Sequence, residues 1–102
     1  MLNQTVIVGR LIDDIKIANV DKLVYNLTLA VPRSYKNDKG EYETDFIDCQ
    51  LWNGIAENTM KNVKKGDLIG IKGRLRKSSI EEKMILIAEK VTFLSSKKEE
   101  EK

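Results

Sequence analysis

The fold is decided by residues 44–52, which read Thr-Asp-Phe-Ile-Asp-Cys-Gln-Leu-Trp. Apolar and polar side chains alternate along this stretch, which predicts a β-strand with one buried face. The buried face would hold Ile47, Cys49 and Leu51. The other face would present the rings of Phe46 and Trp52 beside an acid and an amide. Such rings either lie under a partner or stack on a flat ligand, and nucleic-acid bases suit this kind of sheet best.

Length and composition favour one globular domain without metal or disulfide support. The chain has 102 residues, of which 41% are hydrophobic and 33% are charged, and a domain of this size can bury enough surface to fold alone. One cysteine and no histidine exclude an internal disulfide, a typical zinc site and catalysis by Ser-His-Asp or Cys-His groups. We therefore expect no enzymatic activity, no metal and no cofactor, and we expect Cys49 to be a small buried hydrophobe.

The sequence predicts neither a membrane span nor a signal peptide. No stretch approaches 18 apolar residues, and residues 1–10 contain no basic leader. We therefore expect the protein in the cytoplasm.

Positive charge is concentrated in one segment of the chain. The formal net charge is only +2, but residues 61–77 contain seven basic side chains and one acid, Asp67. A basic segment on a nearly neutral domain favours a localised site for a polyanion. The alternative for any such run of charge is a solvated face without a partner.

The periodicity of the remaining chain predicts five strands and one helix. The strands are expected at residues 4–12, 23–31, 44–52, 67–76 and 83–94, and the helix at 54–65. In the second strand the expected core face is Leu23, Tyr25, Leu27, Leu29 and Val31. Gly9 predicts a bulge or bend in the first strand, and Pro32 is expected to limit pairing beyond the second. Asn53 is the expected N-cap, and Gly66 lies where the helix would stop.

This order of elements predicts an all-β fold with one short helix. Five strands with a helix between the third and fourth are the pattern of the OB-fold, a five-stranded Greek-key barrel that binds oligonucleotides across its middle strands. Alternation alone supports only a small β-barrel with one helix. We expect the barrel to occupy residues 1–94 and the polar residues 95–102 to form a disordered tail.

Two devices hold single-stranded nucleic acid, and the sequence contains candidates for both: aromatic rings that stack on bases, and cations that follow the phosphates. Phe46 and Trp52 would lie about 20 Å apart along one strand, which suits two separate stacked bases. Tyr35 and Tyr42 flank the adjoining hairpin. The expected cations are Lys72, Arg74 and Arg76, which repeat every second residue at intervals of about 7 Å, together with Arg10 and Arg33. Each feature also has a plainer explanation, since exposed rings often pack at interfaces and strand cations are often solvated.

Several blocks of sequence, in this order and spacing, resemble the bacterial-type single-stranded DNA-binding protein family over about residues 1–76, and more weakly to 94. The blocks are Met1–Asn3 with Val6–Leu11, Asn26–Val31, Thr44–Trp52 with Ala56–Asn58, and Lys64–Asp67 with Gly73–Arg76. The variant is most like those of low-GC Gram-positive bacteria and their phages.

The resemblance implies an OB-fold that binds single-stranded DNA without strong sequence preference during replication, recombination and repair. It implies a homotetramer, with a dimer as the alternative, in which the first strand near Asn3 and Val6 forms a dimer contact. It also assigns base stacking to Tyr35, Phe46 and Trp52.

Two departures from the family pattern and one alternative function accompany the resemblance. Ile80 replaces a further aromatic ring after the fourth strand, and the last residues lack the acidic-hydrophobic tip that recruits replication and repair proteins. The alternative is a primosomal or accessory OB-fold module whose exposed rings bind a protein partner.

Overall fold

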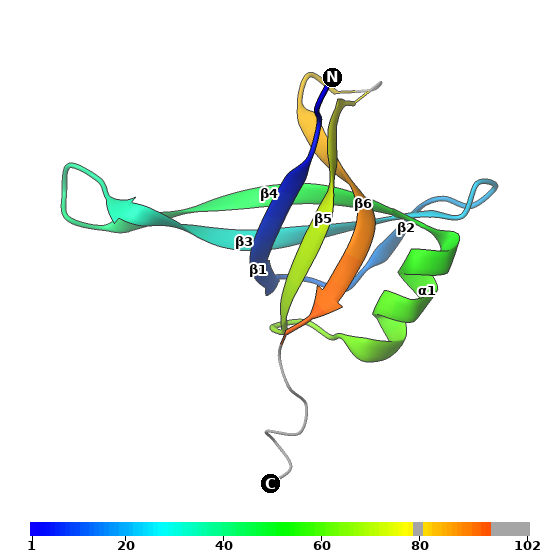
Figure 1. Cartoon of the computed structure of the whole chain (residues 1–102). Coiled ribbons are helices and arrows are strands. Elements are labelled where there is room, and N and C mark those ends of the chain that lie inside the picture. Colours follow the sequence, from blue (N-terminus) through cyan, green and yellow to red (C-terminus); the bar gives the residue numbers. More distant parts are fainter. Residues whose placement is uncertain (79–80, 95–102) are drawn as a thin grey trace, which may run out of the picture.

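The computed structural model describes residues 1–78 and 81–94, which form six strands and one helix (Figure 1). The elements are β1 (Thr5–Leu11), β2 (Lys16–Asn19), β3 (Val24–Lys36), β4 (Tyr42–Trp52), α1 (Asn53–Asn62), β5 (Leu68–Lys77) and β6 (Met84–Phe93). The expectations about Ile80 and the tail at 95–102 lie outside the described residues. Within the described ranges, no helix is long and apolar enough to cross a membrane.

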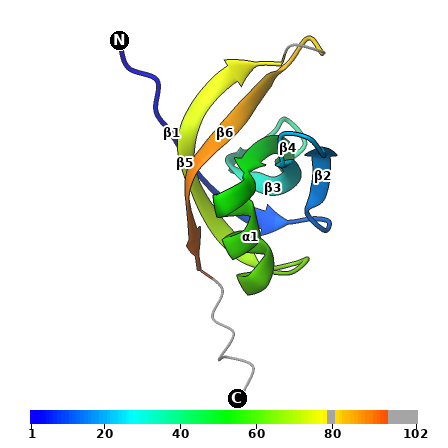
Figure 2. The ribbon, with the colours of Figure 1, turned by 90° about the vertical axis from the view of Figure 1, so that its right-hand side faces the viewer.

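Five of the strands close into a barrel, which confirms the predicted OB-fold. The sheet order is β1-β5-β6-β4-β3, and an additional pairing between β1 and β3 joins its ends. The pairing of β4 with β6 is parallel and the other pairings are antiparallel. Helix α1 lies between the third and fourth barrel strands, as predicted, and packs against β3, β4 and β6 on the side away from the β3–β4 hairpin tip (Figures 1 and 2).

β1 gains a second partner strand just after Gly9. It pairs with β5 from Thr5 to Arg10, and Arg10 and Leu11 pair with Ala30 and Leu29 of β3. A Cβ atom on Gly9 would lie 2.7 Å from the carbonyl oxygen of Ala30, so only glycine allows β1 to approach β3 this closely. The register with β5 runs without a shift, so β1 has no bulge against β5 at Gly9.

The core is formed by the inward-facing side chains of all five barrel strands and by the buried side of α1. The largest fully buried side chains are Leu11, Leu29, Leu51, Ile69, Ile71, Leu86, Thr59 and Cys49. Cys49 is the small buried hydrophobe that the sequence predicted, and burial raises the pKa of its thiol to about 12. Leu51 is buried and Ile47 is half-buried, so the predicted inward face of residues 44–52 is confirmed.

The second strand differs from its prediction at both ends. Leu23 is exposed with a φ of 52° in the turn before β3, and Val24 is buried in its place. At the other end, β3 and β4 pair on past Pro32 as far as Lys36 and Tyr42. Pro32 therefore marks a register shift in a longer hairpin and not the end of pairing, because a proline removes one ladder donor without preventing extended backbone.

The short strand β2 and the ends of α1 also differ from the prediction. All four β2 residues are exposed, so no apolar alternation marks this strand in the sequence. The helix begins at Asn53, with Trp52 at the N-cap position, and Val63 is already extended. Gly66 adopts a φ of 95° in the turn that follows, where the Asp67 carboxylate accepts a hydrogen bond from the backbone of Lys64.

Candidate nucleic-acid interface

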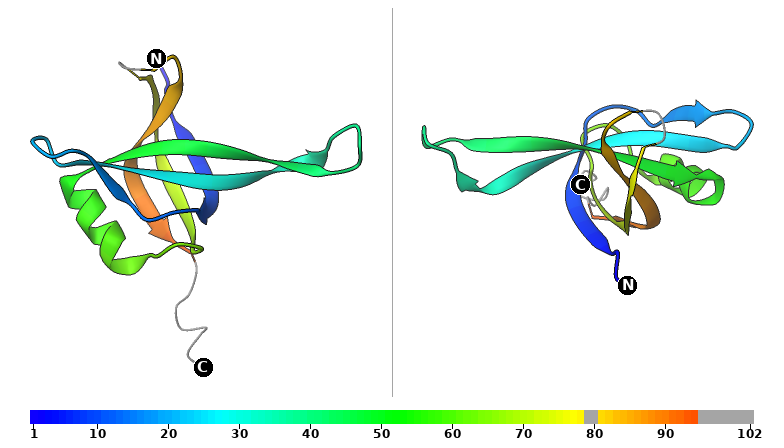
Figure 3. Two further views of the ribbon diagram at one scale, coloured as in Figure 1. Left: turned by 180° about the vertical axis from the view of Figure 1, so that it is seen from behind. Right: turned by 90° about the horizontal axis from the view of Figure 1, so that it is seen from above.

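The β3–β4 hairpin extends beyond the barrel as a long arm, here defined as residues 33–43 (Figures 1 and 3). The ring of Tyr35 is 62% exposed on this arm. Tyr42 stands opposite Lys36, whose Nζ is 5.8 Å from the centre of the Tyr42 ring. The arm therefore presents aromatic and cationic groups to solvent.

The outer face of β4 presents the two rings that the sequence singled out. Phe46 is 64% exposed and Trp52 is 43% exposed, and they lie opposite Ala30 and Val24 of β3. Small or aliphatic neighbours leave the faces of both rings open to a flat ligand. Asp48 and Gln50 occupy the same face between the rings.

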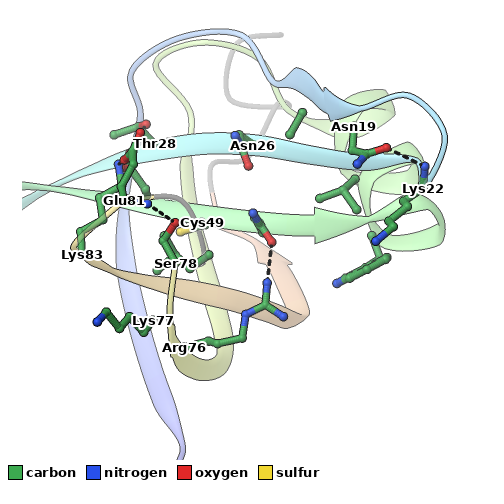
Figure 4. A pocket seen from close by; sticks show the side chains of 16 residues that line it. Asn19, Lys22, Asn26, Thr28, Cys49, Arg76, Lys77, Ser78, Glu81 and Lys83 are labelled. Carbon is green, nitrogen blue, oxygen red and sulfur yellow. Dashed lines mark hydrogen bonds and ion pairs between the residues drawn. The ribbon is translucent and has the colours of Figure 1, made fainter.

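A groove of about 840 Å³ lies between this face and the β5–β6 hairpin (Figure 4). Its walls combine one aromatic ring, that of Trp52, with amide groups and with cations from two hairpins. The amides are Asn19, Asn26 and Gln50, and the cations are Lys22, Arg76, Lys77 and Lys83. The acids in the wall are Asp48 and Glu81, so cations outnumber acids and the groove favours an anionic ligand that carries planar groups.

Side chains tie the β5–β6 hairpin to the floor of the groove. Lys83 Nζ lies 2.5 Å from Oδ2 of Asp48 and 2.9 Å from Oε1 of Glu81. The hydroxyl of Thr28 donates to the other Asp48 oxygen at 2.8 Å, and Arg76 donates to the Gln50 side chain at 3.3 Å. The hydrogen bond from Lys83 and then that from Thr28 lower the pKa of Asp48. The groove therefore contains a carboxylate, that of Asp48, which already pairs with one of the groove's cations, Lys83.

Two of the predicted site residues, Trp52 and Arg76, line the groove. Tyr35 lies on the arm and Phe46 at its base. Lys72 and Arg74 lie further along the outer face of β5, where Lys72 faces Lys90 across the β5–β6 register. The three predicted cations of β5, Lys72, Arg74 and Arg76, therefore lie along one strand that leads away from the groove.

Arg10 and Arg33 already have partners within the chain. Arg10 donates to the carbonyl oxygen of Gly66 at 3.1 Å. Arg33 donates to the carboxylates of Asp45 and Glu43 on the neighbouring strand.

Sequence reasoning did not single out three lysines of the groove wall. Lys22 lies in the β2–β3 turn, whereas Lys77 and Lys83 flank the tip of the β5–β6 hairpin. Lys77 belongs to the basic segment 61–77, and that segment was the sequence feature from which a role for Lys77 in the site could have been inferred. Lys83 reaches Asp48 across 35 residues of sequence, and no local pattern reports such a contact.

Comparison with known proteins agrees with this geometry. The model of the single-strand binding protein family matches residues 2–94. Single-stranded DNA-binding protein B of Bacillus subtilis is 43% identical over 83 residues, which cover 79% of this chain and 74% of that protein. Other relatives come from Listeria and Streptococcus, as the resemblance to Gram-positive forms implied. The chain spans about half to three quarters of the length of the curated relatives it matches.

Solved structures with low sequence identity share the fold. One is the Plasmodium falciparum SSB in complex with ssDNA, with a TM-score of 0.72, 23% identity, and coverage of 93% of this chain and 96% of that one. Another is the dimeric N-terminal domain of PriB from Thermoanaerobacter tencongensis, with a TM-score of 0.73, 19% identity, and coverage of 92% and 98%. At sequence identities this low, the structural similarity shows a shared fold and nothing about function. The family model, however, covers nearly all of the described residues, and the chain belongs to the single-strand binding protein family.

Proposed function

We propose that this protein binds single-stranded DNA without strong sequence preference and protects it during replication, recombination and repair. One observation carries the proposal: the exposed ring of Trp52 lines a groove whose other walls supply lysine and arginine side chains. Stacking on an aromatic ring accepts any base, and cations accept any phosphate, so neither device selects a sequence. Binding of this kind requires no catalytic group, and we propose a non-enzymatic protein that acts in the cytoplasm.

The proposed contacts divide into bases and phosphates. Trp52, Phe46 and Tyr35 would each stack on a base. Arg76, and beyond it Arg74 and Lys72, would follow the phosphates along β5, and Arg10 would add a further contact. Arg33 differs from these cations because two carboxylates already hold its guanidinium.

We further propose that the chain assembles with itself, as a tetramer or a dimer, through the outer side of β1. Val6 is 71% exposed there, and Val8 on the same face is also exposed. Two β-branched side chains on the open face of a strand are a favourable surface for self-association. Sedimentation of the protein with and without oligo-dT would report assembly and binding together, and a monomer under both conditions would contradict the proposed assembly.

The test of DNA binding uses the single tryptophan of the chain. Because that tryptophan is Trp52, its fluorescence should change as oligo-dT is added, and a duplex of the same length should cause a much smaller change. Unchanged fluorescence would contradict the stacking role of Trp52. Absence of any binding by a second method would favour the alternative, an OB-fold module that binds a protein partner.

The basic groove predicts a strong dependence of affinity on salt. If each subunit neutralises four to six phosphates, the slope of log affinity against log salt should be about −3 to −4, at ~0.7 per phosphate. Titrations at several salt concentrations measure this slope. An affinity that stays constant as salt rises would contradict the phosphate contacts.

Replacing Asp48 by Asn should tighten binding and steepen the salt dependence. The carboxylates of Asp48 and Glu81 both hold Lys83 in the DNA-free groove. Removing the Asp48 charge leaves Glu81, the more exposed of the two acids, as the remaining competitor, so Lys83 can neutralise up to about one more phosphate. We expect the slope to steepen by about 0.7, as measured by the same titrations. Replacing both Asp48 and Lys83 by neutral residues should abolish this gain. A slope unchanged in Asp48→Asn would mean that Lys83 does not reach the DNA.

A further inference from the structure

The arm leaves the barrel at a point where the backbone ladder between β3 and β4 is interrupted. Pro32 pairs with Thr44, and the next pair along is Lys36 with Tyr42. Three residues of β3 therefore stand opposite one residue of β4, and Pro32 has no N–H to donate. A backbone with this gap provides few hydrogen bonds to fix the direction of the arm.

A chain of side-chain contacts crosses this gap. The guanidinium of Arg33 donates to both oxygens of Asp45, from Nε at 3.1 Å and from Nη2 at 2.9 Å, and from Nη1 to Glu43 at 2.8 Å. The second oxygen of Glu43 accepts from Asn37 at 3.1 Å. The side-chain oxygen of Asn37 then accepts the backbone N–H groups of Lys39 and Glu41, each at 2.9 Å. The contacts thus run from the base of the arm to its tip.

These contacts have the geometry that allows ion pairs on a protein surface to stabilise the local structure. Exposed ion pairs usually contribute little, except where an arginine binds a carboxylate through two parallel bonds or where several charges form a network. Both conditions hold here. The hydrogen bond from Arg33 lowers the pKa of Asp45.

The same contacts limit what Arg33 can do for DNA. Its positive charge faces two carboxylates, so it offers little net attraction to a phosphate. Tyr35, in contrast, lies between Arg33 and Asn37 in the sequence, so side-chain contacts restrain the backbone two residues before and two residues after its ring.

We propose that Arg33, Asp45, Glu43 and Asn37 form a positioning network that holds the arm, and with it the ring of Tyr35, where a base can stack. The inference rests on the proposed binding of single-stranded DNA. It assigns Arg33 an indirect role through the arm, and it makes two acidic residues favourable for binding an anionic ligand.

The replacement Asp45→Asn separates the two roles of Arg33, because they predict opposite signs. If Arg33 contacts phosphate, removing the Asp45 charge leaves only Glu43 to compete for the guanidinium and should tighten binding to oligo-dT. If the network positions Tyr35, the same change should weaken binding about fivefold or more, the lower end of the cost of one lost stacked base. Glu41→Gln is the matched control, since it removes an acid from the same arm whose carboxylate makes no ion pair within residues 1–78 and 81–94. It should leave affinity unchanged or slightly higher.

Two further variants test the mechanism. Arg33→Lys keeps the positive charge but loses the bidentate hydrogen bonds to Asp45. This variant should therefore weaken binding of oligo-dT about as much as Asp45→Asn does. In a Tyr35→Ala background, Asp45→Asn should cause no further loss, because the network then has no ring to position. Tighter binding by Asp45→Asn, or full affinity of Arg33→Lys, would overturn the proposal.

Amide hydrogen exchange of the DNA-free protein supplies a readout that does not depend on binding. Asp45→Asn should accelerate exchange across residues 33–43 and leave the barrel strands unchanged, whereas Glu41→Gln should match the unmodified protein. If the unmodified protein fails to bind oligo-dT, the proposed function is wrong while exchange still reports on the network. Unchanged exchange in Asp45→Asn would overturn the network itself.

Discussion

Replacing both Phe46 and Trp52 by Ala is expected to weaken binding of single-stranded DNA by about 2–6 kcal/mol. Each ring should stack on one base, and a stacked base contributes roughly 1–3 kcal/mol. The two rings lie about 20 Å apart along β4, so they should serve different bases and their contributions should add. The sum corresponds to a loss of affinity between about 30-fold and about 2 × 10⁴-fold.

The measurement is fluorescence anisotropy of a labelled oligo-dT, since the double variant lacks tryptophan. Both rings are exposed, so the variant should unfold at nearly the same temperature as the unmodified protein. Met60→Ala is the control, because it removes an exposed apolar side chain from α1, which lies outside the groove wall. A loss of less than about threefold in the double variant would mean that the bases do not stack on β4.

The outcome of this experiment depends on a face assignment that the sequence made correctly. Alternation along residues 44–52 predicted which side chains point inward, and the burial of Cys49 and Leu51 confirms it. Alternation is reliable here because a shift by one residue would place Phe46 and Trp52 in the core and expose the aliphatic side chains. The order of the five barrel strands and the helix was equally accessible, since each of these six elements carries its own local pattern.

Features that depend on contacts distant in sequence could not be predicted. The strand β2 has no buried residue, so the sequence contains no periodic signal for it. The pairing of β3 with β4 was predicted to be too short, because a proline such as Pro32 usually marks the end of pairing. In the structure the two strands pair again at Lys36 and Tyr42. The partners of Arg33 lie 10 and 12 residues away on another strand, and Lys83 reaches Asp48 only because the β5–β6 hairpin folds over the groove.

Gly73 shows both what alternation can predict and what it cannot. The alternation of residues 67–76 places Ile69, Ile71, Gly73 and Leu75 on one face of a strand. The first three are buried, whereas Leu75 is exposed. The sequence does not reveal what Gly73 packs against. The register between β5 and β6 shifts at this point, so that Lys72 faces Lys90 while Gly73 faces Ala88, and Glu89 is the extra residue of the bulge. This shift brings the backbone of Ile87 directly over the Cα of Gly73.

Replacing Gly73 by Ala is therefore expected to cost about 3 kcal/mol or more of the free energy of unfolding. The new Cβ would overlap the carbonyl oxygen of Ile87 and lie 2.9 Å from its carbonyl carbon. Both are backbone atoms of β6, so the clash cannot be relieved by rotating a side chain. Overpacking against side chains typically costs 1–3 kcal/mol, and here the β5–β6 ladder must move instead. For a chain of this length the loss should lower Tm by roughly 12 °C or more.

Thermal and urea unfolding of Gly73→Ala and of a matched control measure this effect. The control is Gly54→Ala in α1, where an added Cβ meets no neighbouring heavy atom within 4 Å. Alanine is the better helix former, so this control should unfold at the same temperature or slightly higher. Its free energy of unfolding should rise by at most about 1 kcal/mol. Because both variants add the same methyl group, the difference between them isolates the contact with Ile87. Equal stability of the two variants would contradict the close approach of β6 at the bulge and, with it, the register that brings the β5–β6 hairpin over the groove.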